Sequence, residues 1–159
     1  YRRKIINHVY RGKLQHWDEN IRQLASKSLF GLTSIDPKYV GQVVIPCLLE
    51  TSLDPKNIPI RHGSILGLAE AVRALGDEEG KTKAGLTKNI LTGIAEIVPA
   101  IEKQRLYRGR GGDIVRGAVC RLVSTIKTSS SCNSAKYQES GQSLLMALAS
   151  PLDPKHLRC

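Results

Sequence analysis

The feature that most constrains the fold is an apolar residue followed by arginine, which recurs at the start of three segments with helical patterning. The pairs are Ile21-Arg22, Ile60-Arg61 and Val115-Arg116. Each pair leads into a stripe of Leu, Ala and Val side chains at the spacing of an α-helix. One helix pair cannot bury its own apolar face, whereas a stack of pairs buries a continuous core, so the repetition predicts a helical solenoid.

The spacing of the arginines indicates the class of solenoid. The interval from Arg22 to Arg61 is close to the roughly 40–47 residues of a HEAT-type helix pair, whereas the interval from Arg61 to Arg116 is longer. We therefore predict an all-α fold, a HEAT/armadillo-like α-solenoid of about three helix-pair repeats, with residues 1–159 as a single domain. We expect the extra residues of the longer interval to lie between Lys103 and Asp113.

Apolar stripes and helix-start signals predict where the helices lie. They are expected at about 5–9, 18–32, 36–51, 59–76, 86–101 and 113–128, with a last helix around 144–148. In the second helix Ile21, Leu24, Ala25 and Leu29 share one face, which we expect to be buried. Pro46 should bend the third helix, because proline removes one backbone hydrogen bond.

Acidic residues precede two of the three repeated arginines. Asp18 comes before Arg22, and Asp54 comes before Arg61. In HEAT-type repeats an acidic turn residue can pair with the arginine of the following helix. We therefore expect these arginines to tie repeats together and to touch no ligand.

The charge of the chain favours anionic partners. Lys and Arg number 24 against 14 Asp and Glu, for a formal net charge of +10. Such a field raises encounter rates with anions and weakens as salt rises. Nucleic acid, an anionic membrane and an acidic protein surface all fit this charge. The longest aliphatic run, residues 43–49, contains Pro46 and is far too short to span a bilayer, so we expect a soluble protein with no membrane partner.

Cysteine and histidine spacing gives no sign of a metal or catalytic centre. No pattern of a disulfide framework or zinc site links the four cysteines, which indicates a reducing compartment and predicts that Cys47 and Cys120 act as small core residues. No Ser/His/Asp or Cys/His order can be argued from the four histidines either. We expect no metal, no cofactor, no catalytic residue and no enzyme with its own active site. The residues considered are Cys47, Cys120, Cys132, Cys159, His8, His16, His62 and His156.

The segment from residue 105 to residue 113 is the candidate binding site. It carries Arg105, Arg108 and Arg110 among three glycines, directly before a predicted helix. A helix N-terminus attracts anions, and arginine binds carboxylate or phosphate in two-point fashion. No strand precedes the segment and no Gly-Lys-Ser/Thr follows it, so it matches no phosphate-binding loop. We predict a contact loop for an acidic partner, while a connector with incidental charge, or Arg108 or Arg110 acting on a partner's nucleotide, remain alternatives.

Nucleic acid is the main alternative partner. Six basic residues fall between Lys103 and Arg121 against the one acid Asp113, which would suit a groove that follows phosphates. Aromatic side chains for base stacking are scarce, and Tyr107 is the one aromatic residue in this stretch. A basic helical-repeat module for nucleic acid or another acidic partner is therefore the second hypothesis.

Three blocks of sequence resemble the tubulin-folding cofactor D family. They occur in the family's order and cover most of residues 14 to 126, whereas the serine-rich stretch from residue 128 and the tail after Pro151 show no match. The blocks are His16-Trp17-Asp18 with Ile21-Arg22-Gln23-Leu24-Ala25, then Arg61-His62-Gly63-Ser64-Ile65-Leu66 with Ala69-Glu70, then Leu106-Tyr107-Arg108-Gly109 with Gly111-Gly112, Val115-Arg116 and Ala118-Val119-Cys120.

The resemblance implies a function that the residues alone do not. Members are large cytosolic HEAT-repeat chaperones that capture β-tubulin and, with other tubulin-folding cofactors, join it to α-tubulin. They work alongside a small Arf-like GTPase and take part in stimulating GTP hydrolysis without being self-contained hydrolases. The expectation is a fragment of such a solenoid, cytoplasmic and cytoskeleton-associated, that acts as a protein-binding scaffold.

Overall fold

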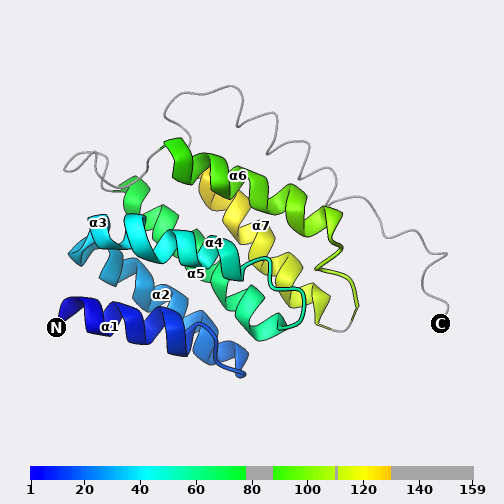
Figure 1. Ribbon diagram of the computed structural model, residues 1–159, viewed down its shortest axis with the longest axis horizontal. Helices are drawn as coiled ribbons and strands as arrows, with labels where there is room; N and C mark the ends of the chain where they lie inside the picture. The colour runs from blue at the N-terminus through cyan, green and yellow to red at the C-terminus, as the bar shows by residue number, and fades with distance from the viewer. Residues whose placement is uncertain (78–87, 110, 130–159) are drawn as a thin grey trace.

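The computed structural model is a stack of helices in two layers (Figure 1). It describes residues 1–77, 88–109 and 111–129, and this part of the chain contains no strand. The first layer, the A layer, holds α1 (Arg2–His8) with the π-helical η1 (Val9–Lys13), α3 (Pro37–Tyr39) with the π-helical η2 (Val40–Val44) and α4 (Ile45–Thr51), and α6 (Lys88–Lys103). The second, the B layer, holds α2 (Glu19–Ile35), α5 (Ile58–Asp77) and α7 (Gly112–Ser129).

Contacts within and between the two layers confirm the helical-repeat solenoid. In the B layer α5 packs against α2 on one side and α7 on the other, and it also contacts α4 of the A layer. The A-layer helices α4 and α6 contact each other as well. Each A helix is followed in sequence by a B helix, so the described residues form three helix pairs, as the repeated arginines predicted.

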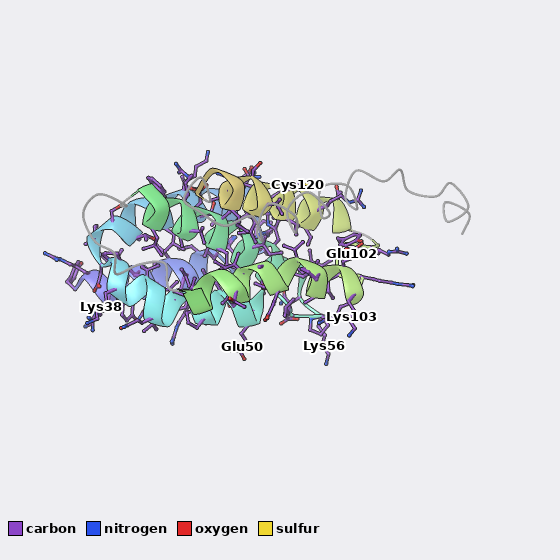
Figure 2. All side chains as sticks on the ribbon, turned by 90° about the horizontal axis from the view of Figure 1, so that it is seen from above. Lys38, Glu50, Lys56, Glu102, Lys103 and Cys120 are labelled. Carbon is purple, nitrogen blue, oxygen red and sulfur yellow. The ribbon has the colours of Figure 1, made fainter. Side chains whose placement is uncertain are left out.

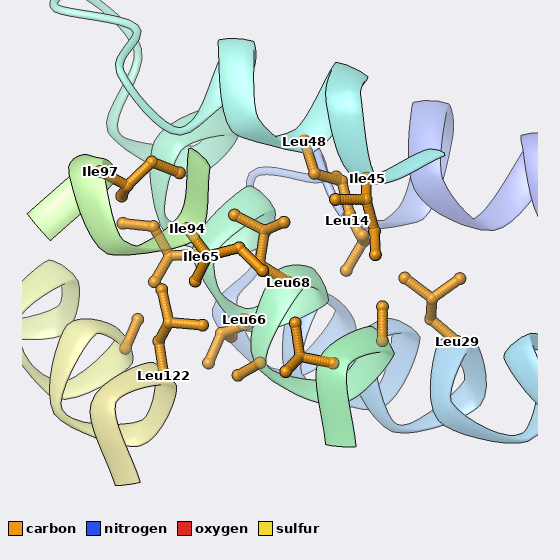
Figure 3. Close-up of a cluster of buried hydrophobic side chains, with 14 of the residues drawn as sticks. Leu14, Leu29, Ile45, Leu48, Ile65, Leu66, Leu68, Ile94, Ile97 and Leu122 are labelled. Carbon is orange, nitrogen blue, oxygen red and sulfur yellow. The ribbon is translucent and has the colours of Figure 1, made fainter. Parts of the chain in front are cut away.

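An aliphatic core runs through all three helix pairs without interruption (Figure 3). In the close-up, Leu14, Leu29 and Leu48 lie at one side of α5, while Ile94 and Leu122 approach it from the other. The chain has few aromatic residues, and helix-on-helix packing can be filled by such aliphatic side chains. Cys47 packs partly buried against this core, but Cys120 is exposed on α7, so its predicted role as a core residue is wrong.

The predicted buried face of α2 is only partly buried. Ala25 and Leu29 lie in the core, whereas the side chains of Ile21 and Leu24 are 37% and 66% exposed. When the three arginines are aligned, Leu24 corresponds to Gly63 of α5 and Ala118 of α7, which are both buried. A Cβ atom at Gly63 would meet Leu14 and Arg22 of the preceding helix pair, whereas within the described residues α2 has no helix pair before it.

Pro46 lies where the second A helix changes type, and the bend expected there stays a prediction. Pro46 lies in the first turn of α4, immediately after the π-helical turn η2. Since proline has no N–H to donate, the regular hydrogen-bond ladder is interrupted there, and a π-type turn is one known result of such an interruption.

The long interval between the second and third arginines has a different origin from the predicted one. Residues 78–87 separate α5 from α6, whereas Asp36 alone separates α2 from α3. Most of the extra length therefore lies before α6 and not between Lys103 and Asp113. Residues 78–87, the predicted helix around 144–148 and the rest of 130–159 lie outside the described residues.

Two of the repeated arginines fasten the turn that precedes their own helix. Arg22 Nη1 donates to the carbonyl oxygens of His16 and Trp17, at 2.8 and 2.7 Å, and Arg61 Nη1 donates to the carbonyl oxygen of Asp54. Both arginines are buried. The expected acid–arginine pairs are therefore replaced by bonds to main-chain carbonyls.

The carboxylates of the turn acids do a different job. The Asp18 side chain accepts from the N–H groups of Asn20 and Ile21 and caps α2. Asp54 accepts in the same way from Lys56 and Asn57. These bonds to Asn57 and Lys56 lower the pKa of Asp54, so both acids stabilise the turn backbone.

Arg22 also links the first helix pair to the second. Its Nε donates to Nδ1 of His62 on α5 at 2.9 Å. His62 is 3% exposed, and burial, together with the nearby Arg22 charge, lowers the pKa of its imidazole to about 4. The ring is therefore neutral in the folded chain at pH 7, where Nδ1 can accept the bond.

The backbones of the first two repeats meet at Gly63. A Cβ atom added to Gly63 would lie 1.7 Å from the carbonyl oxygen of Leu14, and another atom of the same carbonyl would be 2.7 Å away. Only glycine lets α5 approach the end of η1 this closely.

None of the helices in the described part of the chain is long and apolar enough to cross a membrane.

The Gly63 contact predicts opposite effects for two Gly→Ala substitutions. We expect Gly63→Ala to lower the free energy of unfolding by more than about 2 kcal/mol, because a backbone carbonyl must move. Gly31→Ala on the exposed side of α2, where a Cβ would meet nothing within 4 Å, should raise it by about 0.5–1 kcal/mol. Urea unfolding followed by circular dichroism measures both, and a neutral Gly63→Ala would contradict the close approach.

The buried histidine predicts a loss of stability in mild acid. Between pH 6.5 and 4 the unfolded chain binds a proton at His62 that the folded chain does not, so the free energy of unfolding falls as the pH falls through this range. His62→Asn keeps a hydrogen-bond acceptor but cannot titrate. We expect the wild-type chain to lose about 2 kcal/mol more than this variant over that range, measured by urea unfolding at each pH. Parallel pH curves would show that His62 contributes nothing.

Candidate partner-binding surface

The predicted arginine loop lies at the turn between α6 and α7. Arg105 and Arg108 are both exposed there, as a contact loop requires, and Arg110 lies outside the described residues. The structure therefore makes two of the three predicted arginines available to a partner. Whether they bind one stays a prediction.

The backbone of this loop is fixed by hydrogen bonds and by one buried side chain. Leu106 lies in the core, and its N–H donates to the carbonyl oxygen of Ile101 at 3.0 Å. Arg105 N–H donates to Glu102 at 2.9 Å, and Arg108 N–H donates to Arg105 at 3.1 Å. The loop is thus an anchored turn within the third helix pair and not a connector between repeats.

The glycines of the loop have a conformational cause. Gly109 and Gly111 have φ angles of +83° and +78°, in the left-handed region that glycine adopts without strain. Arg105 has a φ of +55° although it carries a side chain, which costs of order 1 kcal/mol. The turn itself explains the glycines, so they do not require a bound phosphate.

A second contact links the loop to the arginine of its own helix. The guanidinium carbon of Arg116 lies 5.7 Å from the ring centroid of Tyr107, within the range of a cation–π interaction. Arg116 therefore contacts the third turn through the ring of Tyr107. Arg22 and Arg61 instead donate hydrogen bonds to main-chain carbonyl oxygens of their turns. All three repeats use the same position for the same task.

The three A-to-B turns form one edge of the described part of the molecule, which we call the turn edge (residues 14–18, 52–57, 104–109 and 111). Figure 2 shows Lys56, Glu102 and Lys103 at this end, with Lys38 at the opposite end. Exposed basic side chains flank each turn: Lys13, Lys56, Lys103, Arg105 and Arg108. The exposed Glu102 and Asp113 offset part of this charge, and so do the half-buried Asp18 and Asp54, which accept from backbone N–H groups.

The B layer contains a charged cluster that the sequence pattern did not predict. The buried Glu70 of α5 forms ion pairs with Arg73 of the same helix, at 2.7 Å, and with Arg121 of α7. The guanidinium of Arg73 lies 3.8 Å from the ring centroid of Phe30 on α2. The signal was a lone acid within a long apolar stretch of the fourth predicted helix, since such an acid needs a cationic partner when it is buried.

No group of three or more His, Cys, Asp or Glu side chains among the described residues is placed to hold a metal ion. The histidines with structural contacts are His16, which stacks on Trp17 and accepts from the Asp18 N–H, and His62, which accepts from Arg22. Both act within the fold. The expectation that the chain has no active site of its own stays a prediction.

Comparison with known proteins finds a similarity to a tubulin-specific chaperone. Tubulin-specific chaperone D of Dictyostelium discoideum is 27% identical to this chain over 122 residues, which are 77% of the chain and 8% of that protein. No protein-family profile and no solved structure matches the chain. The chain therefore spans only a small part of the relative's length, and this similarity supports the resemblance that the three sequence blocks carry.

Proposed function

We propose that this chain is a segment of a tubulin-folding chaperone and acts as a protein-binding scaffold for β-tubulin. Its role would lie in β-tubulin capture and in the assembly and disassembly of the αβ-tubulin heterodimer. The observation that carries the proposal is the similarity to Tubulin-specific chaperone D over 77% of the chain. The stacked helix pairs support it, since solenoids offer extended surfaces to other proteins.

The turn edge is the surface that fits this role. It presents Arg105 and Arg108 on an anchored turn, close to Lys56 and Lys103 at the same end of the stack. A loop whose backbone is already fixed loses less conformational freedom on binding than a mobile one. The surface of tubulin is acidic, so the basic turn edge is complementary to it.

Further partners belong to the same proposal. Other tubulin-folding cofactors and a small Arf-like GTPase would assemble on the longer chaperone, in the cytoplasm and near the microtubule cytoskeleton. In this proposal the chain has no active site of its own and contributes at most to the activation of a partner's GTPase. The exposed guanidiniums of the turn edge are the groups through which it would do so.

The proposal predicts that neutral turn-edge residues weaken tubulin binding. Arg105→Asn removes a charge and suits the left-handed backbone at that position, and it would be combined with Arg108→Gln and Arg110→Gln. We expect the dissociation constant for purified tubulin in about 0.1 M salt to rise roughly fivefold, since each exposed pair contributes about 0.2–1 kcal/mol. Biolayer interferometry measures the constant, and circular dichroism confirms the helices.

Arg2→Gln combined with Lys4→Gln and Lys38→Gln is the matched control, because it also removes three positive charges and all three residues are exposed at the starts of A helices, away from the turn edge. Equal affinity of the turn-edge variant and the wild type would exclude this edge as the contact. A wild-type chain that binds no tubulin but binds duplex DNA with a steep salt dependence would overturn the proposal in favour of the nucleic-acid module.

A further inference from the structure

We infer that Arg73, Glu70 and Arg121 form a second binding site, on the B layer, which takes a side-chain carboxylate of an acidic protein segment. We call these three residues the B-layer cluster. The inference rests on the proposed scaffold function, which it deepens by naming a contact away from the turn edge and the chemistry that this contact recognises.

The B-layer cluster holds two guanidiniums around one buried carboxylate. Oε2 of Glu70 accepts from Nε and Nη2 of Arg73, at 3.1 and 2.7 Å, and Oε1 accepts from Nη2 of Arg121. The Glu70 side chain is 2% exposed, whereas those of Arg73 and Arg121 are 46% and 40% exposed. The negative charge is thus hidden, and the positive charges face outward.

The charges of the B-layer cluster do not balance. Two guanidiniums against one carboxylate leave a local charge of +1, and each guanidinium has N–H groups that Glu70 does not use. Lys27 of α2 is exposed one helical turn before Phe30 and adds to the positive field. An incoming carboxylate would neutralise the excess charge. Its oxygens would accept hydrogen bonds from the guanidinium N–H groups that Glu70 does not use.

The two guanidiniums are already held in place before any ligand arrives. Arg73 stacks on the ring of Phe30 and is bound through two of its nitrogens to the carboxylate, and Arg121 is held by the same carboxylate. Fixed donors lose little conformational entropy on binding. A buried ion pair alone is a weak source of stability compared with apolar packing, so stability does not by itself account for the B-layer cluster.

The lack of a stacking surface favours a protein carboxylate over nucleic acid. A side-chain carboxylate carries one negative charge, which matches the excess of +1, as does a single phosphodiester. A nucleic acid would gain little from base stacking here, because Arg73 lies over the Phe30 ring. An acidic peptide segment is therefore the occupant that the chemistry fits best.

Opposite charge changes at the B-layer cluster provide the test, with a fluorescently labelled deca-glutamate peptide as the probe. Arg121→Gln and, separately, Arg73→Gln should raise the dissociation constant of the peptide three- to tenfold at low salt. Glu70→Gln removes the hidden negative charge and should lower that constant about threefold, although it removes two ion pairs and lowers the melting temperature. Lys38→Gln is the control, with one exposed positive charge removed at a distance.

A merely structural role would lower stability in all three variants without raising affinity in Glu70→Gln. Unchanged or weaker peptide binding by Glu70→Gln, or unchanged binding by both arginine variants, overturns the site. Arg121→Lys, which keeps the charge, replaces Arg121→Gln if the latter does not fold, and it should bind the peptide within twofold of the wild type. Equally tight binding of a single-stranded DNA oligonucleotide that depends on the same residues would also overturn it, in favour of a phosphate site.

The test separates this site from the proposed function. A chain that binds tubulin, while its B-layer variants bind the peptide as the wild type does, loses the site and keeps the scaffold function. A chain that binds the peptide through these residues but fails to bind tubulin keeps the site and loses the tubulin assignment.

Discussion

The rest of the structure depends on the burial of α5 between its neighbours. Every residue from Arg61 to Val72 is buried, since α2, α4 and α7 all pack around this helix. A helix covered on so many sides must be apolar or small almost throughout, and its few polar residues need partners within the fold. This constraint explains three residues of α5. Gly63 allows the close approach of another backbone, whereas His62 binds Arg22 of α2 and Glu70 binds Arg121 of α7.

Polar contacts in the core set how one repeat lies against the next. Aliphatic ridges allow a helix to slide or rotate at modest cost, whereas a directed hydrogen bond does not. The bond from Arg22 to His62 fixes the first junction, and the ion pair from Arg121 to Glu70 fixes the second. At the second junction Glu70 both links the repeats and holds the partly exposed guanidiniums of Arg73 and Arg121.

The sequence predicts the helices well and their surroundings less well. The apolar-Arg pairs of α2, α5 and α7 are local signals that recur three times, so both helix type and pairing could be predicted from them. The exposure of Leu24 could not, because the same pattern is buried in α5 and α7 and depends on whether a helix lies alongside. The Glu70–Arg121 pair joins residues of different helices and leaves no local pattern, and the arginine loop was recognised by composition while its anchoring by Leu106 was not.

The contact between Gly63 and Leu14 makes the two junctions mechanically unequal. Where two backbones touch, as η1 and α5 do there, no soft layer of side chains separates the helices and there is little room to tilt. The junction of α5 with α7 is filled instead by interdigitated side chains such as Val115 and Leu122, which can change rotamer. The first junction therefore has no side-chain layer that could adjust, whereas the second is held by packed side chains and by the Glu70–Arg121 ion pair.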